Sequence, residues 1–250
     1  MASDPRPRLI EIINELHDLQ ASKLLQFAEA LAVPIERWVN PASDVATEPF
    51  AEEFEARLKL HHATHSKQLD RVGLEDAIRA SSAAAGRTVH GPMGATRRFI
   101  DEVIDGQRIA IKSTAAQNVH EQFLHISKVS EAAWIQDVRG AQAREEKTKA
   151  QIAEYIAEVD RLWQMRILPD RLRWRYQFVE IPMALLGPVA RLDRALFAPD
   201  GPTIIVRDGV GPCLTLKLDR SDAKITFARI PIDRCIVHAT WTLDKKPGDA

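Results

Sequence analysis

The chain has 250 residues, of which 45% are hydrophobic and 28% charged, and its formal net charge at pH 7 is -1. These values are typical of a folded protein with one substantial core, and they exclude binding to nucleic acid through overall charge alone. No run of about 18 apolar residues exists and the N-terminus lacks the plan of a signal peptide, so we expect no membrane span and a cytoplasmic location.

The N-terminal part is expected to be helical. Residues 7–31 show helical periodicity, and Ser22 could cap a second helix there. A proline-containing linker over 40–50 follows. We therefore expect an N-terminal helical segment over 1–45 and a main domain over 46–250, packed as one compact domain overall.

The main domain begins with a helical pattern over 51–85, and glycines between 86 and 94 mark a loop. Next come two short apolar strands, 99–104 and 107–112, joined by Asp105-Gly106. Residues 115–128 are expected to be mostly helical or mixed, and 131–166 helical throughout.

The last third reads as strands. The run 175–186 is expected to stop at Pro182, and further strand-like runs cover 203–209, 213–220, 223–230 and 235–243. Helices, a hairpin, helices and then strands indicate an α/β or α+β fold with a mixed central sheet flanked by helices. Cys213 and Cys235 fall in separate strand-like runs and are expected to be free thiols.

The hairpin carries the main chemical signal. Its geometry places Asp101 and Lys112 on neighbouring strands, away from the turn. A carboxylate beside a lysine can hold Mg²⁺ and activate a water for phosphodiester hydrolysis. The alternative is an ordinary cross-strand ion pair.

A single carboxylate provides few protein ligands for such a metal site, so a second is expected. The position two residues before Lys112, on the same strand face, holds Ala110 instead of an acid. Glu75 on the preceding helix and Glu121 after the hairpin are the candidates for the missing carboxylate.

The segment 161–176 holds five arginines, two tryptophans and a tyrosine against the single acid Asp170. Arginine forks suit phosphate oxygens and guanine edges, so Arg171 and Arg173 are candidates for DNA contact. The alternative is the solvated basic face at the end of an amphipathic helix.

Other polar residues have two interpretations each. His61 and His65 share a helix face and could bind metal, although His61 and His62 fit structural or DNA-phosphate roles better. Ser113 and Thr114 are expected to cap a helix.

Gln117 and Asn118 could read adenine, contact phosphate or cap the same helix. Ser127 and Lys128 are placed for DNA backbone contacts.

Gln177 and Glu180 lie in an apolar run, and both are candidates for DNA contact. Glu180 could read cytosine or be a buried partner for an arginine, and His238 is expected to be a core histidine.

The hairpin, with Asp101, Asp105-Gly106 and Ile109-Ala110-Ile111-Lys112, resembles the core of PD-(D/E)XK nucleases. Further stretches in the same order resemble the SmaI type of type II restriction endonuclease, and together they cover most of residues 54–243. They are "RLKLHHATHS", "GLEDAI", "AAQN", "LHISK", "YQFVEIP" and "CIVHATW". The residues before Asp101 do not give the usual Pro-Asp pair.

The resemblance implies a Mg²⁺-dependent endonuclease of a restriction–modification system, paired with a DNA methyltransferase. It implies a homodimer that cuts duplex DNA at a short GC-rich palindrome, CCCGGG or a relative. In it, Asp101 would bind the metal, Lys112 would polarise the attacking water, and Glu75, ranked above Glu121, would supply the second carboxylate. Alternatives are a structure-specific repair or junction nuclease on the same core, and a DNA-binding protein without catalysis.

Overall fold

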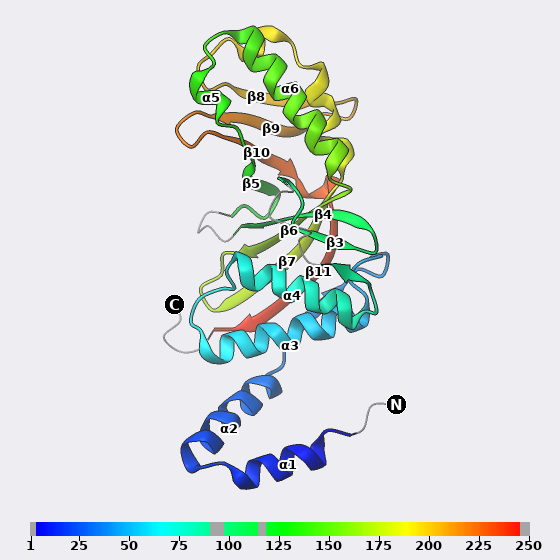
Figure 1. The fold of residues 1–250 in the computed structure, drawn as a ribbon, viewed down its shortest axis with the longest axis vertical. Helices are drawn as coiled ribbons and strands as arrows, with labels where there is room; N and C mark the ends of the chain where they lie inside the picture. Colours follow the sequence, from blue (N-terminus) through cyan, green and yellow to red (C-terminus); the bar gives the residue numbers. More distant parts are fainter. Residues whose placement is uncertain (1–3, 91–97, 115–118, 246–250) are drawn as a thin grey trace.

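The computed structural model describes residues 4–90, 98–114 and 119–245. A seven-stranded sheet lies in the middle of the molecule, a four-stranded sheet lies at one end, and two helices project from the other end (Figure 1). Within the described ranges, no helix is long and apolar enough to cross a membrane.

The central sheet has the strand order β1-β11-β7-β6-β4-β3-β2. Strands β4 and β6 run parallel, and the other neighbouring pairs are antiparallel. The prediction of a mixed sheet is confirmed. Its strands are β1 (Glu36–Val39), β2 (Val89–His90), β3 (Glu102–Ile104), β4 (Gln107–Thr114), β6 (Arg161–Leu168), β7 (Arg173–Ile181) and β11 (Ile236–Asp244).

The second sheet has the order β5-β10-β9-β8. Helices α5 (Trp134–Asp137) and α6 (Ala141–Glu158) lie beside it at the same end of the molecule (Figure 1). Three short 3-10 helices within 183–197 pack there too, and a fourth covers 232–234. Its strands are β5 (Phe123–Glu131), β8 (Thr203–Arg207), β9 (Pro212–Asp219) and β10 (Lys224–Pro231).

Alternating side chains of the central strands feed two apolar cores, as the period of two requires. Ile109 and Ile111 of β4 point into the core beneath helices α3 (Glu48–Thr64) and α4 (Arg71–Ala84). Ala110, between them, belongs to the other core, which β5, α6 and the second sheet complete. The hairpin of β3 and β4 therefore lies at the junction of the two sheets.

The prediction of the hairpin is confirmed. Asp105 and Gly106 have φ angles of 51° and 77°, the positive values that a two-residue turn of this kind needs. Glu102 pairs with Ile109, and Ile104 with Gln107. The strands expected in the last third are also present, and β7 ends at Ile181, directly before Pro182.

Three expectations for helices were wrong. The pattern over 51–85 is two helices, because Asp70 caps α4 by accepting a hydrogen bond from the Gly73 amide at 2.8 Å. Residues 119–131 form no helix: Ser113 and Thr114 end β4 instead of capping one, and β5 follows from Phe123. The helix expected over 131–166 ends at Glu158, and β6 begins at Arg161.

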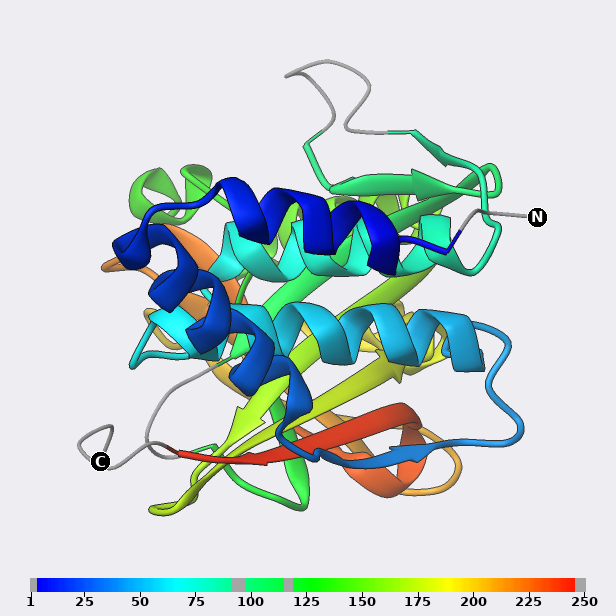
Figure 2. The same ribbon diagram turned by 90° about the horizontal axis from the view of Figure 1, so that it is seen from below.

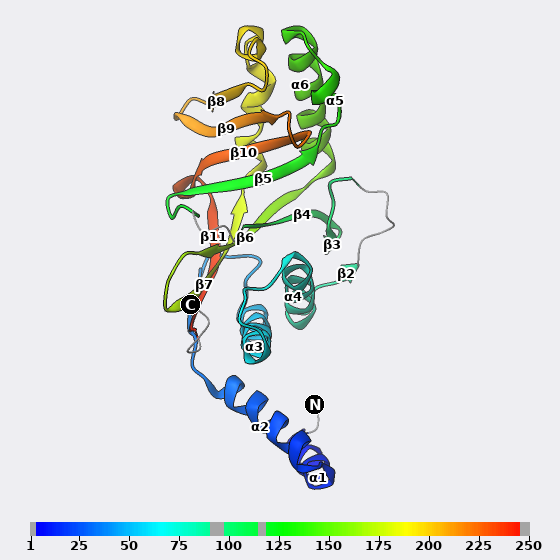
Figure 3. The same ribbon diagram turned by 90° about the vertical axis from the view of Figure 1, so that its left-hand side faces the viewer.

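The helices α1 (Arg6–Glu15) and α2 (Asp18–Ala32) extend from the body below α3 (Figures 2 and 3). Ser22 does not cap the second helix, because it lies inside α2. The helix begins one turn earlier, where the backbone amide of His17 donates to Gln20 Oε1 at 3.1 Å.

Candidate active site

Asp101 and Lys112 face each other at the open end of the hairpin. The ammonium of Lys112 lies 3.3 Å from Asp101 Oδ2. The same oxygen accepts a hydrogen bond from the Ile111 amide at 2.7 Å, and the Asp101 amide donates to the Ile109 carbonyl at 2.9 Å. Both side chains are only about one-fifth exposed. The Ile111 amide thus fixes one carboxylate oxygen, and the second oxygen of Asp101 has no hydrogen-bond partner among residues 4–90, 98–114 and 119–245.

This pair lines an open cleft of about 770 Å³ between β4 and β5. Ser127 and Lys128 of β5 line the same cleft, so the structure brings these two predicted residues to the Asp101–Lys112 pair. Lys128 pairs with Glu131 at 2.5 Å and is half exposed. Cationic side chains in the cleft wall can meet phosphate oxygens.

Two cleft arginines were missed in the sequence. Arg71, at the start of α4, and Arg98, just before the hairpin, line the cleft together with Lys112. Neither lies in a motif, and only the packing of α4 and β5 around the hairpin brings them there. The cleft therefore carries more positive charge than the chain as a whole suggests.

Glu75 approaches the pair from α4. Its burial raises its pKa; Arg71, 3.1 Å away, opposes that rise, and the negative charge of Asp101 adds to it. Asp101 and Lys112 both act on the pKa of Glu75, which puts two carboxylates and an ammonium in one neighbourhood. Two neighbouring carboxylates are suited to binding a cation.

Ala110 is fully buried in the apolar core, which gives a physical reason for the missing acid on β4. A carboxylate there would be desolvated among aliphatic side chains. Glu121 pairs with Arg175 of β7 at 2.8 Å. Neither Glu121 nor Glu75 lines the cleft directly, but Asp101 and Lys112 both influence the pKa of Glu75.

Tyr155 of α6 is a further residue that sequence reasoning missed. Its ring packs edge-on against Phe99 at 5.1 Å, and its hydroxyl is buried with no hydrogen-bond partner in the described part of the chain. Burial raises the pKa of Tyr155, and the charge of Asp101 raises it further. Tyr155 thus lies close enough to sense the Asp101 carboxylate from the core side.

The donor set fits a hard cation of the Mg²⁺ kind. No group of three or more His, Cys, Asp or Glu side chains forms a metal site in the ranges that the structure covers. Mg²⁺ does not need one, because it takes one or two carboxylates and keeps several waters. Asp101 and Glu75 are the side chains that could hold it.

The family model of SmaI, type II site-specific deoxyribonuclease, matches residues 11–242. The chain belongs to this family. The type II restriction enzyme SmaI of Serratia marcescens is 23% identical over 242 residues, which cover 94% of this chain and 95% of that enzyme. No solved structure matches.

Membership of the SmaI family makes the chain a DNA-cleaving enzyme and confirms the resemblance seen in the sequence. The curled mixed sheet with flanking helices is compatible with the restriction-endonuclease-like core that was predicted. The interpretation as a DNA-binding protein without catalysis is therefore wrong.

A second cavity of about 560 Å³ adjoins the cleft, and Ser113 and Ser127 line both. Its wall includes Gln164, whose side-chain amide donates to Thr114 Oγ1 at 2.6 Å and to the His125 carbonyl at 2.7 Å. The cleft thus continues along β4 and β5 past the Asp101–Lys112 pair. Gln117 and Asn118 lie outside the described residues.

Gln177 is engaged inside the protein. Its side-chain oxygen accepts a hydrogen bond from Arg166 at 2.6 Å. Arg166 is only 2% exposed, and it also donates to the carbonyls of His120, Glu121 and Phe123. This arginine fastens the segment before β5 to the central sheet.

Glu180 lies in a buried polar network. Its Oε2 accepts from Arg161 at 2.7 Å, from Trp163 Nε1 at 2.9 Å and contacts His238 Nε2 at 3.2 Å. Burial alone would raise the pKa of Glu180, but the hydrogen bonds from His238 and Arg161 outweigh it and lower the pKa. Of the two alternatives for Glu180, this geometry is that of a buried arginine partner, and His238 is a core histidine.

The three histidines of α3 and its end lie apart from the cleft lining. His62 is buried, contacts the Tyr176 hydroxyl at 2.9 Å and stacks on Trp174. His61 contacts the Lys67 carbonyl at 2.8 Å and stacks on His65 at 4.5 Å. Burial lowers the pKa of His61.

The arginine-rich segment is a β-hairpin, so its interpretation as the end of an amphipathic helix was wrong. Two of its five arginines, Arg161 and Arg166, are buried. Arg171 is exposed at the turn, and Arg173 pairs with Glu36 at 3.4 Å. The segment therefore does not form one basic surface, and neither Arg171 nor Arg173 lines the cleft.

Proposed function

We propose that the chain hydrolyses both strands of duplex DNA at a short GC-rich palindrome, with Mg²⁺ held by Asp101 and Glu75. The observation that carries this proposal is the Asp101–Lys112 pair at the junction of the two sheets, with Glu75 within electrostatic reach. The resemblance seen in the sequence makes CCCGGG or a relative the first target to test.

Each residue has a task in hydrolysis. The reaction joins a water oxygen to phosphorus and breaks one phosphorus–oxygen ester bond, and the leaving oxygen takes up a proton. Lys112 orients the water and stabilises the negative charge that grows on the phosphate. Bound Mg²⁺ would supply a further positive charge at the same phosphate.

DNA is held by the cationic wall of the cleft. Lys128, Arg71 and Arg98 line it and can meet backbone oxygens on either side of the scissile phosphate, while Ser127 can donate a neutral hydrogen bond. These contacts position the backbone and carry no sequence information of their own. A palindrome is read most simply by a two-fold symmetric homodimer, with one cleft for each strand.

The test is digestion of unmethylated phage DNA by the purified protein with Mg²⁺, followed by sequencing of the fragment ends. Discrete ends that share one GC-rich palindrome are expected. Random ends, or cutting confined to forked or branched DNA, would overturn site-specific cleavage and favour a structure-specific nuclease. In a restriction–modification system, methylation of the same palindrome by the partner methyltransferase should block cutting.

A further inference from the structure

The projecting helices α1 and α2 expose large apolar side chains without a core beneath them. Neither helix has a buried residue. On α1, Leu9, Ile12 and Ile13 are 46%, 39% and 41% exposed. On α2, Leu19 and Leu25 are 73% and 59% exposed. Several large apolar side chains exposed on projecting helices indicate an interaction site.

The apolar side chains of α1 form one stripe. Leu9, Ile12 and Ile13 follow the spacing of three and four residues that places side chains on one helix face, and the half-buried Leu16 lies just beyond the end of α1. Figure 3 shows α1 at the tip of the projection, beyond α2, and α2 leads from α1 into β1 of the central sheet. The stripe is therefore free of the enzyme body and open to a partner.

The charges of α1 are arranged against its own dipole. Arg6 and Arg8 lie in its first turn and Glu11 and Glu15 follow, with no acid in the first turn and no base in the last. The helix macrodipole favours the opposite arrangement, acids at the N-terminus and bases at the C-terminus. Within the chain, Arg6 pairs with Asp4 at 2.9 Å and Arg8 with Glu11 at 2.8 Å, both on the exposed surface. Glu15 has no ion pair among the described residues.

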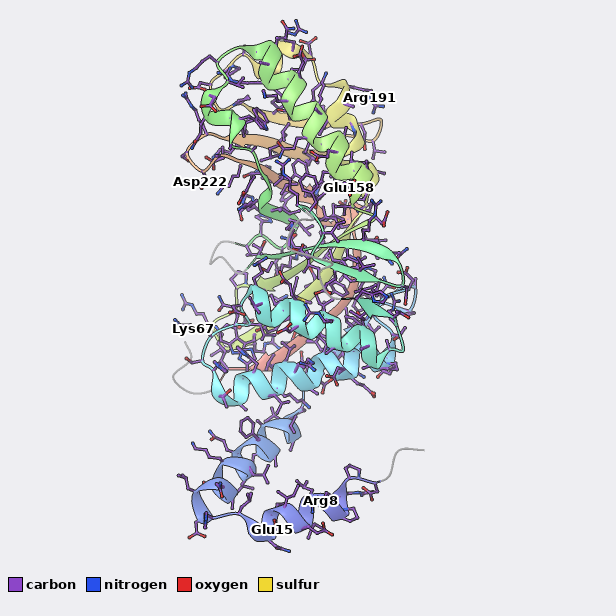
Figure 4. All side chains as sticks on the ribbon, viewed as in Figure 1. Arg8, Glu15, Lys67, Glu158, Arg191 and Asp222 are labelled. Carbon is purple, nitrogen blue, oxygen red and sulfur yellow. The ribbon has the colours of Figure 1, made fainter. Side chains whose placement is uncertain are left out.

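A second copy of α1, running antiparallel, gives Glu15 a partner. Arg8 and Glu15 are seven residues apart, so they lie on one flank of the apolar stripe, at opposite ends of the helix (Figure 4). In an antiparallel pair of identical helices, equal flanks meet. Arg8 of each copy then lies beside Glu15 of the other, the apolar stripes face each other, and the two dipoles oppose.

We propose that α1 and α2 form the contact between two copies of this chain, with the two α1 helices packed antiparallel about a two-fold axis. This rests on the proposed cleavage of a palindrome, which calls for a homodimer, and it names the surface that holds the two copies together. The contact lies outside the cleft, so the catalytic residues stay open to DNA.

The first test is sedimentation equilibrium of the full chain without DNA. Wild type is expected to be dimeric, and Ile13→Asp should raise the dimer dissociation constant by about 100-fold, since it places an unpaired charge in the contact. Val210→Asp is the matched control, because Val210 is 85% exposed on the hairpin between β8 and β9. It should leave the constant unchanged, and circular dichroism should show all three proteins folded.

A charge swap makes the test specific for the antiparallel pair. Arg8→Glu alone and Glu15→Arg alone should each raise the dissociation constant by about tenfold, and the double variant should return to within about threefold of wild type. Double-strand cleavage should follow dimer content. A wild type that stays monomeric, a dimer that survives Ile13→Asp, or single and double charge variants that behave alike would overturn the proposal.

Failure of the proposed contact through α1 and α2 and failure of the proposed function give different results. A monomeric wild type that still yields discrete palindromic ends overturns only the contact. Variants that dissociate as expected, from a wild type that does not cut DNA, support the contact and contradict the proposed function.

Discussion

Two regions of this enzyme place charged side chains in or beside apolar strands, and they differ in how far those side chains are exposed to solvent. At the cleft, Asp101 and Lys112 are part-exposed and beside an open volume. Around Glu180, the carboxylate is closed in by Arg161, Trp163 and His238. The first arrangement leaves an oxygen and an ammonium for a ligand, whereas the second satisfies its members internally. A charged residue in an apolar strand becomes a site only where the fold leaves space beside it.

The largest expected effect comes from Lys112→Ala. The cleavage rate should fall by about 10³-fold, because the ammonium stabilises charge that develops only during reaction. DNA binding measured with Ca²⁺ should stay within about threefold of wild type.

Lys128→Ala is the matched control for Lys112→Ala, since it removes a lysine from the same cleft but not the pair with Asp101. It should cut within about tenfold of wild type. Equal losses in the two variants would show that Lys112 serves binding alone.

Glu180→Ala tests the closed region. It leaves Arg161 buried with one fewer partner, so the free energy of unfolding should fall by about 3–5 kcal/mol in urea. Cleavage per folded molecule should be unchanged. Asp44→Ala removes the other, largely exposed partner of Arg161 and should cost less than about 1 kcal/mol. A stable Glu180→Ala with altered cleavage sites would assign Glu180 to base recognition instead.

Glu75→Gln tests the second carboxylate. Cleavage should fall by about 100-fold, and a higher Mg²⁺ concentration should be needed for half-maximal rate. Glu121→Gln is the control and should cut as wild type does. The reverse result would move the second carboxylate to Glu121.

The ionisation of Glu75 makes the stability of the fold depend on pH, and the sign of this dependence follows from its raised pKa. The folded-state pKa of Glu75 is raised, so its ionisation costs stability as pH rises above the ordinary value of 4.5 and through the folded pKa. Without metal, Glu75→Gln should therefore melt higher than wild type at pH 7, and the difference should vanish below about pH 4. The same proton competes with metal, so wild-type Mg²⁺ affinity should fall as the pH drops through the folded pKa.

The smallest effect concerns phosphate contacts. Lys128→Ala should make the negative slope of log affinity against log salt concentration shallower by about one. Arg173→Ala should leave the slope unchanged, because Arg173 pairs with Glu36 and Asp170 outside the cleft. A steeper change for Arg173 would place DNA along the β6–β7 turn.

The hairpin could be predicted because its signals are local. Asp105-Gly106 sets the turn, and the turn fixes which residues face each other. The prediction of a helix over 131–166 failed at its C-terminal end, where the chain forms β6. The strand conformation of β6 is set by its long-range pairing with β4 and β7, which a local sequence pattern does not reveal. The burial of Arg166 depends likewise on carbonyls more than 40 residues away in the chain.

The candidate site divides in the same way. The positions of Asp101 and Lys112 follow from the hairpin. The sequence alone left Glu75 and Glu121 as candidates for the second carboxylate, and the packing of α4 favours Glu75. The arginines of 161–176 do not share one surface: some are buried and others are exposed, because side chains along a strand alternate between its two faces.

The most direct measurement is single-turnover cleavage of a plasmid by wild type and by Asp101→Asn at equal DNA occupancy, each with Mg²⁺ and with EDTA. Wild type with Mg²⁺ should give a discrete linear product, and Asp101→Asn should cut at least about 10³-fold more slowly while binding DNA as tightly. Cutting by Asp101→Asn at the wild-type rate, or by wild type in EDTA, would contradict the assignment of the hairpin as the catalytic centre.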